Sequence, residues 1–224
     1  MPLDNLYESE WVDATYGGIE GMAKRFDQVM ALPPHKSDNA QRVHRVTRFA
    51  ASRSSPDTTT PTSPKGGRLL DVGAGIGVFP AAMRDAGWDV VAVEPDPRTV
   101  QMLTDRLGIK TEARDFLTLR RHDLGTFDAV TFNKVLEHVE DPVELLSHAR
   151  EFLEPGGFCY VEVPDTLAAD EGPDRGEFNV AHHHVFSPAS LVLLVERSGF
   201  NIRHVERLHE PSGKFSVYAF LERS

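Results

Sequence analysis

Three glycines in one short segment are the first residues of this sequence that point to chemistry. Gly73, Gly75 and Gly77 follow an apolar run and precede a helical pattern. Glycines between a strand and a helix allow a tight turn and let a ligand approach the backbone at the positive end of the helix. Glu94 stands roughly 20 residues further on, where a carboxylate can accept hydrogen bonds from both ribose hydroxyls. Together these residues indicate a site for a nucleoside-containing ligand.

Two residues disfavour a dinucleotide, such as a nicotinamide cofactor, as that ligand. The dinucleotide pattern needs its third glycine at position 78, which is Val78, and the acidic Asp71 precedes the loop. A carboxylate there would repel a pyrophosphate, whereas it would attract the ammonium of an amino-acid group, directly or through water. A dehydrogenase is therefore the less favoured interpretation.

Three consecutive histidines, His182, His183 and His184, form the second group of interest. They lie in a long segment between a predicted strand and a predicted helix, and loops at the carboxyl ends of parallel strands carry function in such folds. A histidine there can act as general base for an alcohol, which keeps its proton at neutral pH. Substrate positioning without proton transfer and ordinary loop hydrogen bonding are the alternatives.

The same histidines also raise the question of a metal. In an extended segment His182 and His184 would face one way, and a carboxylate such as Asp165 or Glu177 could join them. The chain has no HExxH pattern and a single cysteine, Cys159, so the metal signal is weak. We expect catalysis without a bound metal ion.

Strands and helices are predicted to alternate from residue 68 onward. Because short apolar runs alternate with helical patterns, we expect an α/β fold with a mostly parallel sheet covered on both faces and a C-terminal antiparallel hairpin. The predicted strands are 69–72, 90–93, 127–132, 158–163, 201–207 and 214–222, and the predicted helices are 76–86, 97–107, one that begins at Pro142 and one that begins at Pro188.

The N-terminal part is predicted to be separate from this fold. Apolar residues recur at helical spacing in residues 1–50, which we expect to form a helical N-terminal cap. Residues 51–67 are rich in Ser, Thr and Pro and are predicted to be a linker. Residues 68–224 would then be the main domain, and the cap would form a lid or one wall of an acceptor pocket.

Several cap residues have side chains suited to ligand contacts. Aromatic residues could stack on a ring of the acceptor, although aromatic residues at helical spacing more often pack in a core. Basic residues could meet a phosphate if the acceptor carries one, although a solvated helix face is the favoured explanation of these charges. The aromatic residues are Tyr7, Trp11, Tyr16 and Phe26, and the basic ones are Lys36, Arg42 and Arg45.

The segment 71–77, with the sequence Asp-Val-Gly-Ala-Gly-Ile-Gly, together with Glu94 resembles the binding signature of class I S-adenosylmethionine-dependent methyltransferases. The segments 114–116, 127–138 and 153–157 resemble the corresponding later parts of that family, and the resemblance covers about residues 68–222. It implies a Rossmann-like, doubly wound sheet of seven strands. A doubly wound domain without a cofactor is the alternative.

The resemblance implies a role for particular residues in binding S-adenosylmethionine. Glu94 would bind the ribose, Asp115 the adenine amino group with Phe116 beside the ring, and the turn after 127–133 would lie beside the methionine part. Asp115 has the alternative role of a helix cap, and Glu137 and His138 either pack or line the pocket. The expected cofactor-binding residues are Asp71, Gly73, Ala74, Gly75, Gly77, Glu94, Pro95, Asp115, Phe116, Asn133 and Lys134.

The amino-acid composition argues against some classes of binding partner. Lys and Arg total 24 against 34 Asp and Glu, a net charge of -10, which repels phosphate backbones and anionic lipid. No apolar run approaches the ~18 residues of a membrane span, and the N-terminus lacks a signal-peptide pattern. We therefore expect a cytoplasmic protein that binds neither nucleic acid nor membrane. Monomer and homodimer both stay open.

The segment 182–187, where His182 stands four residues before Phe186, resembles one common in small-molecule and sugar methyltransferases. The sequence thus predicts transfer of a methyl group to a small molecule, with a hydroxyl of a sugar or glycan precursor as the favoured acceptor and His182 or a neighbour as base. The alternatives are N- or C-methylation of another small metabolite, and a cofactor-binding partner protein without catalysis.

Overall fold

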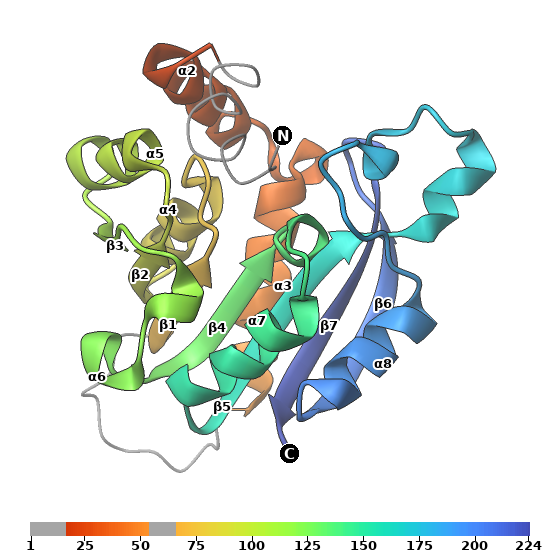
Figure 1. Cartoon of the computed structure of the whole chain (residues 1–224). Coiled ribbons are helices and arrows are strands. Elements are labelled where there is room, and N and C mark those ends of the chain that lie inside the picture. Colours follow the sequence, from red (N-terminus) through yellow and green to blue (C-terminus); the bar gives the residue numbers. More distant parts are fainter. Residues whose placement is uncertain (1–16, 54–65) are drawn as a thin grey trace, which may run out of the picture.

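The computed structural model of this chain describes residues 17–53 and 66–224, and their strands form one seven-stranded sheet (Figure 1). The order is β3-β2-β1-β4-β5-β7-β6. The pairs from β3 to β5 are parallel, and β7 is antiparallel to both β5 and β6. The strands are β1 (Arg68–Val72), β2 (Asp89–Val93), β3 (Lys110–Glu112), β4 (Phe127–Asn133), β5 (Leu153–Pro164), β6 (Phe200–His209) and β7 (Phe215–Arg223).

This arrangement confirms the predicted α/β fold with a parallel core and a C-terminal antiparallel hairpin. The strand order reverses between β1 and β4, so the connections that leave these two neighbouring strands run in opposite directions. In open α/β sheets such a switch point leaves a crevice outside the carboxyl ends of the strands, where ligands bind. A ligand site is therefore expected at the segments that follow β1, β2 and β4.

Helices cover both faces of the sheet (Figure 1). One face packs against α2, α3 and α4, which contribute buried side chains such as Met22, Val46 and Phe79, and the other packs against α7 and α8. Neighbouring residues of β1, Leu69 and Leu70, face opposite sides, which is why buried parallel strands read as continuous apolar runs. The α-helices are α2 (Ile19–Met30), α3 (Asp38–Arg53), α4 (Val78–Asp85), α5 (Pro97–Gln101), α6 (Arg121–Leu124), α7 (Pro142–His148) and α8 (Pro188–Arg197).

Short 3₁₀ and π-helical segments complete the connections between these elements. The turn that extends α5 is π-helical, and the others are 3₁₀ turns. They are η3 (Pro34–Lys36), η4 (Met102–Arg106), η5 (Phe116–Thr118), η6 (Leu136–His138), η7 (Ala149–Phe152), η8 (Thr166–Glu171) and η9 (Gly176–Phe178).

Two element boundaries differ from the sequence prediction for physical reasons. The helix expected over 76–86 begins at Val78, because Gly77 takes the left-handed conformation with φ 82 and ends the glycine loop. The turn 153–157 belongs to β5 itself, where the register with β4 shifts between Phe127 and Ala129. The helix predicted to begin at Pro142 does so as α7, and it is capped by the Asp141 side chain, which accepts a hydrogen bond from the Glu144 N–H.

The N-terminal helix α3 packs closely on the sheet. The ring of Phe49 stacks on that of Phe220 with centroids 3.9 Å apart, and it meets Phe158 edge-on at 5.0 Å. The helix continues to Arg53, three residues into the predicted linker, and residues 54–65 lie outside the described part of the chain. Phe26 is a core residue packed on this same face.

Arg42 and Arg45 of α3 do not lie on a solvated helix face as expected, whereas Arg48 of the same helix is exposed. Arg42 is 8% exposed, and both Arg42 and Arg45 bind the buried carboxylate of Glu162 in β5. The predicted availability of these two cations for a phosphate is therefore wrong, because an internal partner already holds them. Tyr7, Trp11 and Tyr16 lie outside the described residues. In the part of the chain that the structure describes, no helix has the length and apolar character needed to cross a membrane.

Candidate functional site

The glycine loop between β1 and α4 is open on one side. Gly73, Gly75 and Gly77 all have positive φ, at 70, 51 and 82, a conformation that suits glycine because it has no Cβ. A Cβ on Gly73 would lie 2.7 Å from the Val135 side chain, whereas one on Gly75 would meet no heavy atom of the described residues within 4 Å. Packing therefore requires glycine at the first position, and the second position offers its backbone to a ligand.

Glu94 lies at the lip of this loop, directly after β2. Its Oε2 accepts a hydrogen bond from the Gly75 N–H at 2.9 Å, and its Oε1 accepts one from the Asp96 N–H at 3.2 Å. Burial raises the pKa of its carboxyl, while these backbone N–H bonds act in the opposite direction. A carboxylate offers about four lone-pair positions, so two backbone bonds leave acceptor capacity for two hydroxyls of a ribose. Pro95, which follows, is exposed.

Asp71 lies beneath the loop and joins β1 to β4. It is 1% exposed, and its Oδ1 accepts hydrogen bonds from the Thr131 hydroxyl at 2.7 Å and from the Asn133 amide at 2.9 Å. Burial raises the pKa of this carboxyl to about 7. Asn133 Oδ1 is buried and finds no hydrogen-bond partner within residues 17–53 and 66–224. An unused acceptor next to a carboxylate fits the ammonium of an amino-acid group.

Lys134 follows Asn133 and is the one non-glycine residue with positive φ, at 61, among the described residues. Its backbone N–H donates to the Glu162 carbonyl at 2.8 Å. Its ammonium donates to the Ser216 hydroxyl and lies 3.5 Å from a Glu210 oxygen and 3.7 Å from a Glu162 oxygen. The side chain is thus held by β5 and the hairpin. Any contact of Lys134 with a cofactor would be made by its backbone, at the strained turn.

Asp115 and Phe116 lie at the start of η5. Asp115 is exposed, and one of its oxygens caps this turn by accepting from the Leu117 N–H at 2.9 Å. The cap leaves its other oxygen available. The ring of Phe116 is buried between Phe132 and Phe152, with centroids 6.0 and 5.1 Å away. A ligand at this position would therefore meet the backbone of Phe116 rather than its ring.

A buried ionic network around Glu162 lies next to the end of β4, and it was not predicted from the sequence. Glu162 is fully buried, and it binds Arg42 and Arg45 and lies near Lys134. Burial alone would raise the pKa of its carboxyl, but these cations together hold it well below its ordinary value. The signal was present, since Glu162 is the one acid in the apolar run 158–163, and such a charge must be paired when buried.

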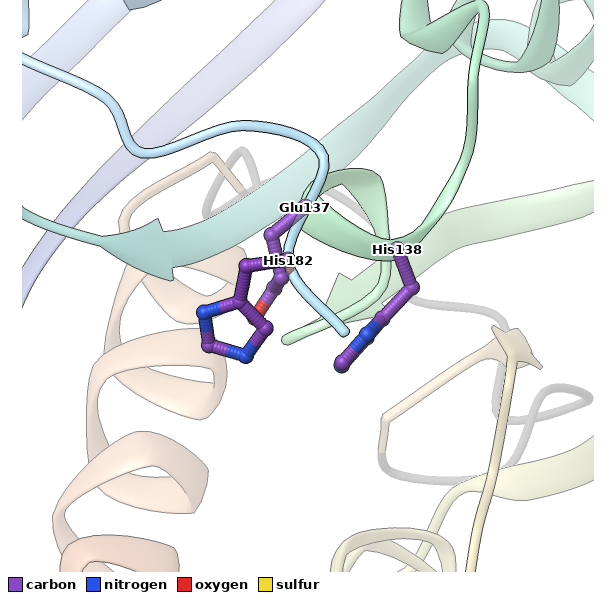
Figure 2. Close-up of side chains that lie close together, drawn as sticks. All are labelled: Glu137, His138 and His182. Carbon is purple, nitrogen blue, oxygen red and sulfur yellow. The ribbon is translucent and has the colours of Figure 1, made fainter. Parts of the chain in front are cut away.

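The three consecutive histidines do not act as one group. His182 lies beside His138, with ring centroids 4.8 Å apart in an edge-to-face arrangement (Figure 2). His183 is exposed, and the His184 ring lies 3.3 Å from the Glu140 carbonyl. The expected pairing of His182 with His184 is therefore wrong: the segment turns here, so that alternate residues do not share a face.

Glu137, one of two residues whose role the sequence left open, joins this pair. It is 1% exposed, and burial raises its pKa to about 7. Figure 2 shows its carboxylate directed toward the rings of His182 and His138. The Glu137 carbonyl accepts from the N–H groups of His183 and His184 at 2.7 and 3.3 Å, which fastens the histidine segment to η6. Burial lowers the pKa of His138.

Asp165 and Glu177, the other acids considered as ligands, are engaged elsewhere. Asp165 lies 2.8 Å from the Arg207 guanidinium, and its other oxygen accepts from the Leu167 N–H. Glu177 binds Arg175 at 3.0 Å and accepts from the Phe215 N–H at 2.7 Å. The fold therefore brings Glu137, His138 and His182 together beside the end of β4, and Val135, close to Gly73 of the glycine loop, lies just before them in the chain.

The sequence of this chain is similar to those of known methyltransferases. Residues 40–205 match the model of a methyltransferase domain family. A ubiquinone biosynthesis O-methyltransferase of Xanthomonas axonopodis is 29% identical over 164 residues, which are 66% of this chain and 69% of that protein. A ubiquinone biosynthesis O-methyltransferase of Cereibacter sphaeroides is 32% identical over 123 residues, 53% of this chain and 50% of that protein.

Solved structures share the fold at lower identity. The Burkholderia thailandensis 1,6-didemethyltoxoflavin-N1-methyltransferase, crystallised with S-adenosylhomocysteine, is 20% identical with a TM-score of 0.60 and covers 84% of this chain and 80% of its own. The glycopeptide N-methyltransferase MtfA with S-adenosylmethionine is 20% identical with a TM-score of 0.60, over 81% and 94% of the two chains. Since the family model matches well over half of the chain, the protein belongs to the methyltransferase domain family, within the class I S-adenosylmethionine-dependent methyltransferases.

Proposed function

We propose that this protein binds S-adenosylmethionine against its glycine loop and the adjoining carboxylate of Glu94 and transfers the methyl group to a hydroxyl oxygen of a small molecule. The observation that carries this proposal is the carboxylate of Glu94, 2.9 Å from the Gly75 N–H at the open side of the loop. This carboxylate follows β2, the neighbour of β1 at the carboxyl end of the sheet, and it has acceptor capacity left for a ribose.

The neighbouring residues suit the remaining parts of the cofactor. Asp115 follows β3, and its second oxygen, for which the described residues provide no hydrogen-bond donor, is suited to the adenine amino group. Asp71 and the unpartnered Oδ1 of Asn133 lie toward the amino-acid part. When bound, the cofactor supplies an electrophilic methyl group on a sulfonium. The protein has to hold an acceptor in line with that methyl group and exclude water.

The acceptor would lie beside the cluster of Glu137, His138 and His182. This cluster follows β4, so it is on the same edge of the sheet as the glycine loop. A hydroxyl must lose its proton as the new C–O bond forms, and a group of this cluster is suited to promote that loss. The relatives named as O-methyltransferases support oxygen as the methylated atom. A sugar or glycan precursor remains the acceptor class we propose.

The N-terminal helices would form a wall of the acceptor space. Figure 1 shows α2 near the edge of the sheet toward which β4 and β5 point. It is held there by packing of Met22 in the core and by the ion pair between Asp27 and Arg106, at 2.6 Å. Helix α3 continues the same wall along the sheet and is fixed by Arg42.

The test is formation of S-adenosylhomocysteine and of a methylated product from S-adenosylmethionine and a panel of free sugars, nucleotide sugars and phenols. We expect His182→Ala to lower turnover by about tenfold or more while the affinity for S-adenosylmethionine stays nearly unchanged. The matched control is His122→Ala, because His122 is exposed and remote from the site. Methylation confined to amine acceptors, or full activity of His182→Ala, would contradict the proposal.

A further inference from the structure

We propose that Glu137, His138 and His182 form a binding site for one divalent transition-metal ion. The role of that ion, to hold the acceptor oxygen, rests on the proposed function, whereas the binding of the ion does not. One ligand atom from each residue lies within 4.8 Å of the other two (Figure 2). Small rotations of the side chains would bring these atoms to the spacing that one ion of about 2.0–2.2 Å ligand distance requires.

A bound cation would compensate the buried carboxylate of Glu137 for the hydrogen bond that one of its oxygens lacks. The side chain is 1% exposed, and its Oε2 has no hydrogen-bond partner in the described part of the chain. A buried carboxylate oxygen without a partner is costly. Glu162 and Glu210, the buried acids of the neighbouring network, have arginine or lysine within ion-pair distance, whereas among the described residues Lys134 and Arg42 attract Glu137 only from further away.

Both imidazoles are held in the way that metal-ligating histidines are held. Nδ1 of His138 lies 3.0 Å from the Ala181 carbonyl, and Nδ1 of His182 lies 2.8 Å from the Glu177 carbonyl. A carbonyl only accepts, so each Nδ1 must carry the hydrogen and donate it. The lone pair of each ring is then on Nε2. A histidine that binds a metal through one ring nitrogen typically donates the N–H of its other ring nitrogen to a carbonyl or carboxylate. This hydrogen bond fixes the tautomer and the orientation of the ring.

The backbone brings these residues together although they are far apart in sequence. The Glu137 carbonyl accepts from His183 and His184 N–H groups, and the His182 N–H donates to the Asn179 carbonyl at 2.9 Å. Glu137 is buried while His138 and His182 are half-buried. The cluster is therefore closed toward the core and accessible from the other side, as a site with open coordination positions must be.

The donor set decides the class of ion. Two imidazole nitrogens and one carboxylate oxygen suit first-row transition metals such as Mn²⁺, Fe²⁺, Co²⁺ and Zn²⁺ better than Mg²⁺ or Ca²⁺, which prefer oxygen alone. Three protein ligands leave positions for the acceptor. A hydroxyl bound there becomes more acidic and releases its proton to solvent. Its oxygen then attacks the methyl carbon, the C–O bond forms as the C–S bond breaks, and S-adenosylhomocysteine leaves. In this scheme His182 is a ligand rather than the base.

The site is tested with the metal alone. Protein stripped by a chelator is titrated with Zn²⁺ by calorimetry and with Co²⁺ by visible absorption, in the absence of cofactor and acceptor. We expect one ion per chain, and a loss of affinity of about tenfold or more in Glu137→Gln and in His182→Gln. His122→Gln is the matched control, because His122 is an exposed histidine beside Asp123, at 3.9 Å, and should bind as the wild type does.

Equal affinity in the wild type and in both cluster variants, or no binding of one equivalent, overturns the site. If Glu137→Gln is not folded by circular dichroism, His182→Gln decides the question, since His182 is only half-buried. A second measurement separates the site from the proposed function. Methylation of a hydroxyl at the wild-type rate by stripped enzyme overturns the role of the ion. If the ion binds and its affinity falls in the cluster variants, but the protein methylates no hydroxyl, the metal site is confirmed and the proposed function is contradicted.

Discussion

Glu94 is the residue on which the proposed cofactor site depends most. Its carboxylate connects the loop after β1 to the end of β2 through the Gly75 N–H, so it both shapes the glycine loop and presents acceptor oxygens at its lip. The loop and this acid were recognisable from spacing alone, because glycine conformation and strand-end position are local properties of the sequence.

Replacing Glu94 with Ala should weaken S-adenosylmethionine binding at least tenfold, about 1.4 kcal/mol, because charge-assisted hydrogen bonds to the ribose are lost. Calorimetric titration measures this affinity. Glu112→Ala is a suitable control, since Glu112 is a partly exposed acid at the end of the adjacent strand β3. Unchanged affinity of the Glu94 variant would refute the ribose role.

Asp71 shows the cost of keeping a carboxylate beneath the site. Burial raises its folded pKa from 3.8 to about 7, so the folded state binds a proton more tightly than the unfolded state does. The contribution of Asp71 to the free energy of unfolding is therefore greatest at low pH. It is lost as pH rises from about 4 to about 7, by an amount on the order of a few kcal/mol.

The variant Asp71→Asn should remove this dependence, because an Asn oxygen can still accept from Thr131 and Asn133 without carrying a charge. We expect the ligand-free variant to be more stable than the wild type at pH 8 and to have a flatter stability profile between pH 5 and pH 8. Urea denaturation at pH 5 and pH 8 measures the free energy of unfolding of both proteins. Calorimetry should also show that the variant binds S-adenosylmethionine more weakly. A steeper pH dependence in the variant than in the wild type would show that the sign is wrong.

The cluster of Glu137, His138 and His182 could be predicted only in part from the sequence. The sequence placed a histidine near the site, but the partners of His182 are separated from it by more than forty positions. Their meeting depends on how the segment 176–186 folds back onto η6, through backbone hydrogen bonds that side-chain types do not encode. The grouping of histidines by alternation failed for the same reason.

At the scale of elements, α3 is the helix whose position the sequence could not fix. Its periodicity predicts a helix, but only the structure shows that its basic side chains enter the core and reach Glu162 in β5. The strands were easier to predict, since buried parallel strands give short apolar runs. The end of the glycine loop and the bulge within β5 depend on backbone conformation at glycine and on strand register, which such runs do not reveal.

Arg42 is expected to be the side chain that fixes α3 to the sheet. Arg42→Met should lower the free energy of unfolding by about 3 kcal/mol, because it leaves the buried Glu162 with an incomplete set of partners. Arg45 and Lys134 remain close to this carboxylate, which keeps the loss at the lower end for a buried pair. Chemical denaturation measures it.

The double variant Arg42→Met with Glu162→Gln provides the control for this prediction. If the loss arises from the unpaired charge, removing that charge as well should restore part of the stability, and the two substitutions will not be additive. Strict additivity would instead assign the effect to the packing of the Arg42 side chain alone.

At the scale of the whole molecule, the sheet explains why these elements meet. The parallel strands deliver the glycine loop, Glu94, Asn133 and Glu137 to one edge, and the reversal of strand order between β1 and β4 separates the connections that would otherwise cover it. The net charge of -10 disfavours long polyanions near that edge, which agrees with a small acceptor.

A ligand that binds only the folded chain at this edge must stabilise the whole chain. At a concentration 100 times its dissociation constant, S-adenosylmethionine should add about 2.7 kcal/mol, which corresponds to a rise in Tm of about 5–10 °C for a chain of this size. S-adenosylhomocysteine should act in the same direction, because it keeps the adenosine and amino-acid parts. NAD⁺ at the same concentration should leave Tm unchanged, since Asp71 and Val78 do not suit a pyrophosphate. A rise with NAD⁺ and none with S-adenosylmethionine, followed by differential scanning calorimetry, would reverse the assignment of the site, because mass action links the shift directly to which nucleoside ligand the folded chain binds.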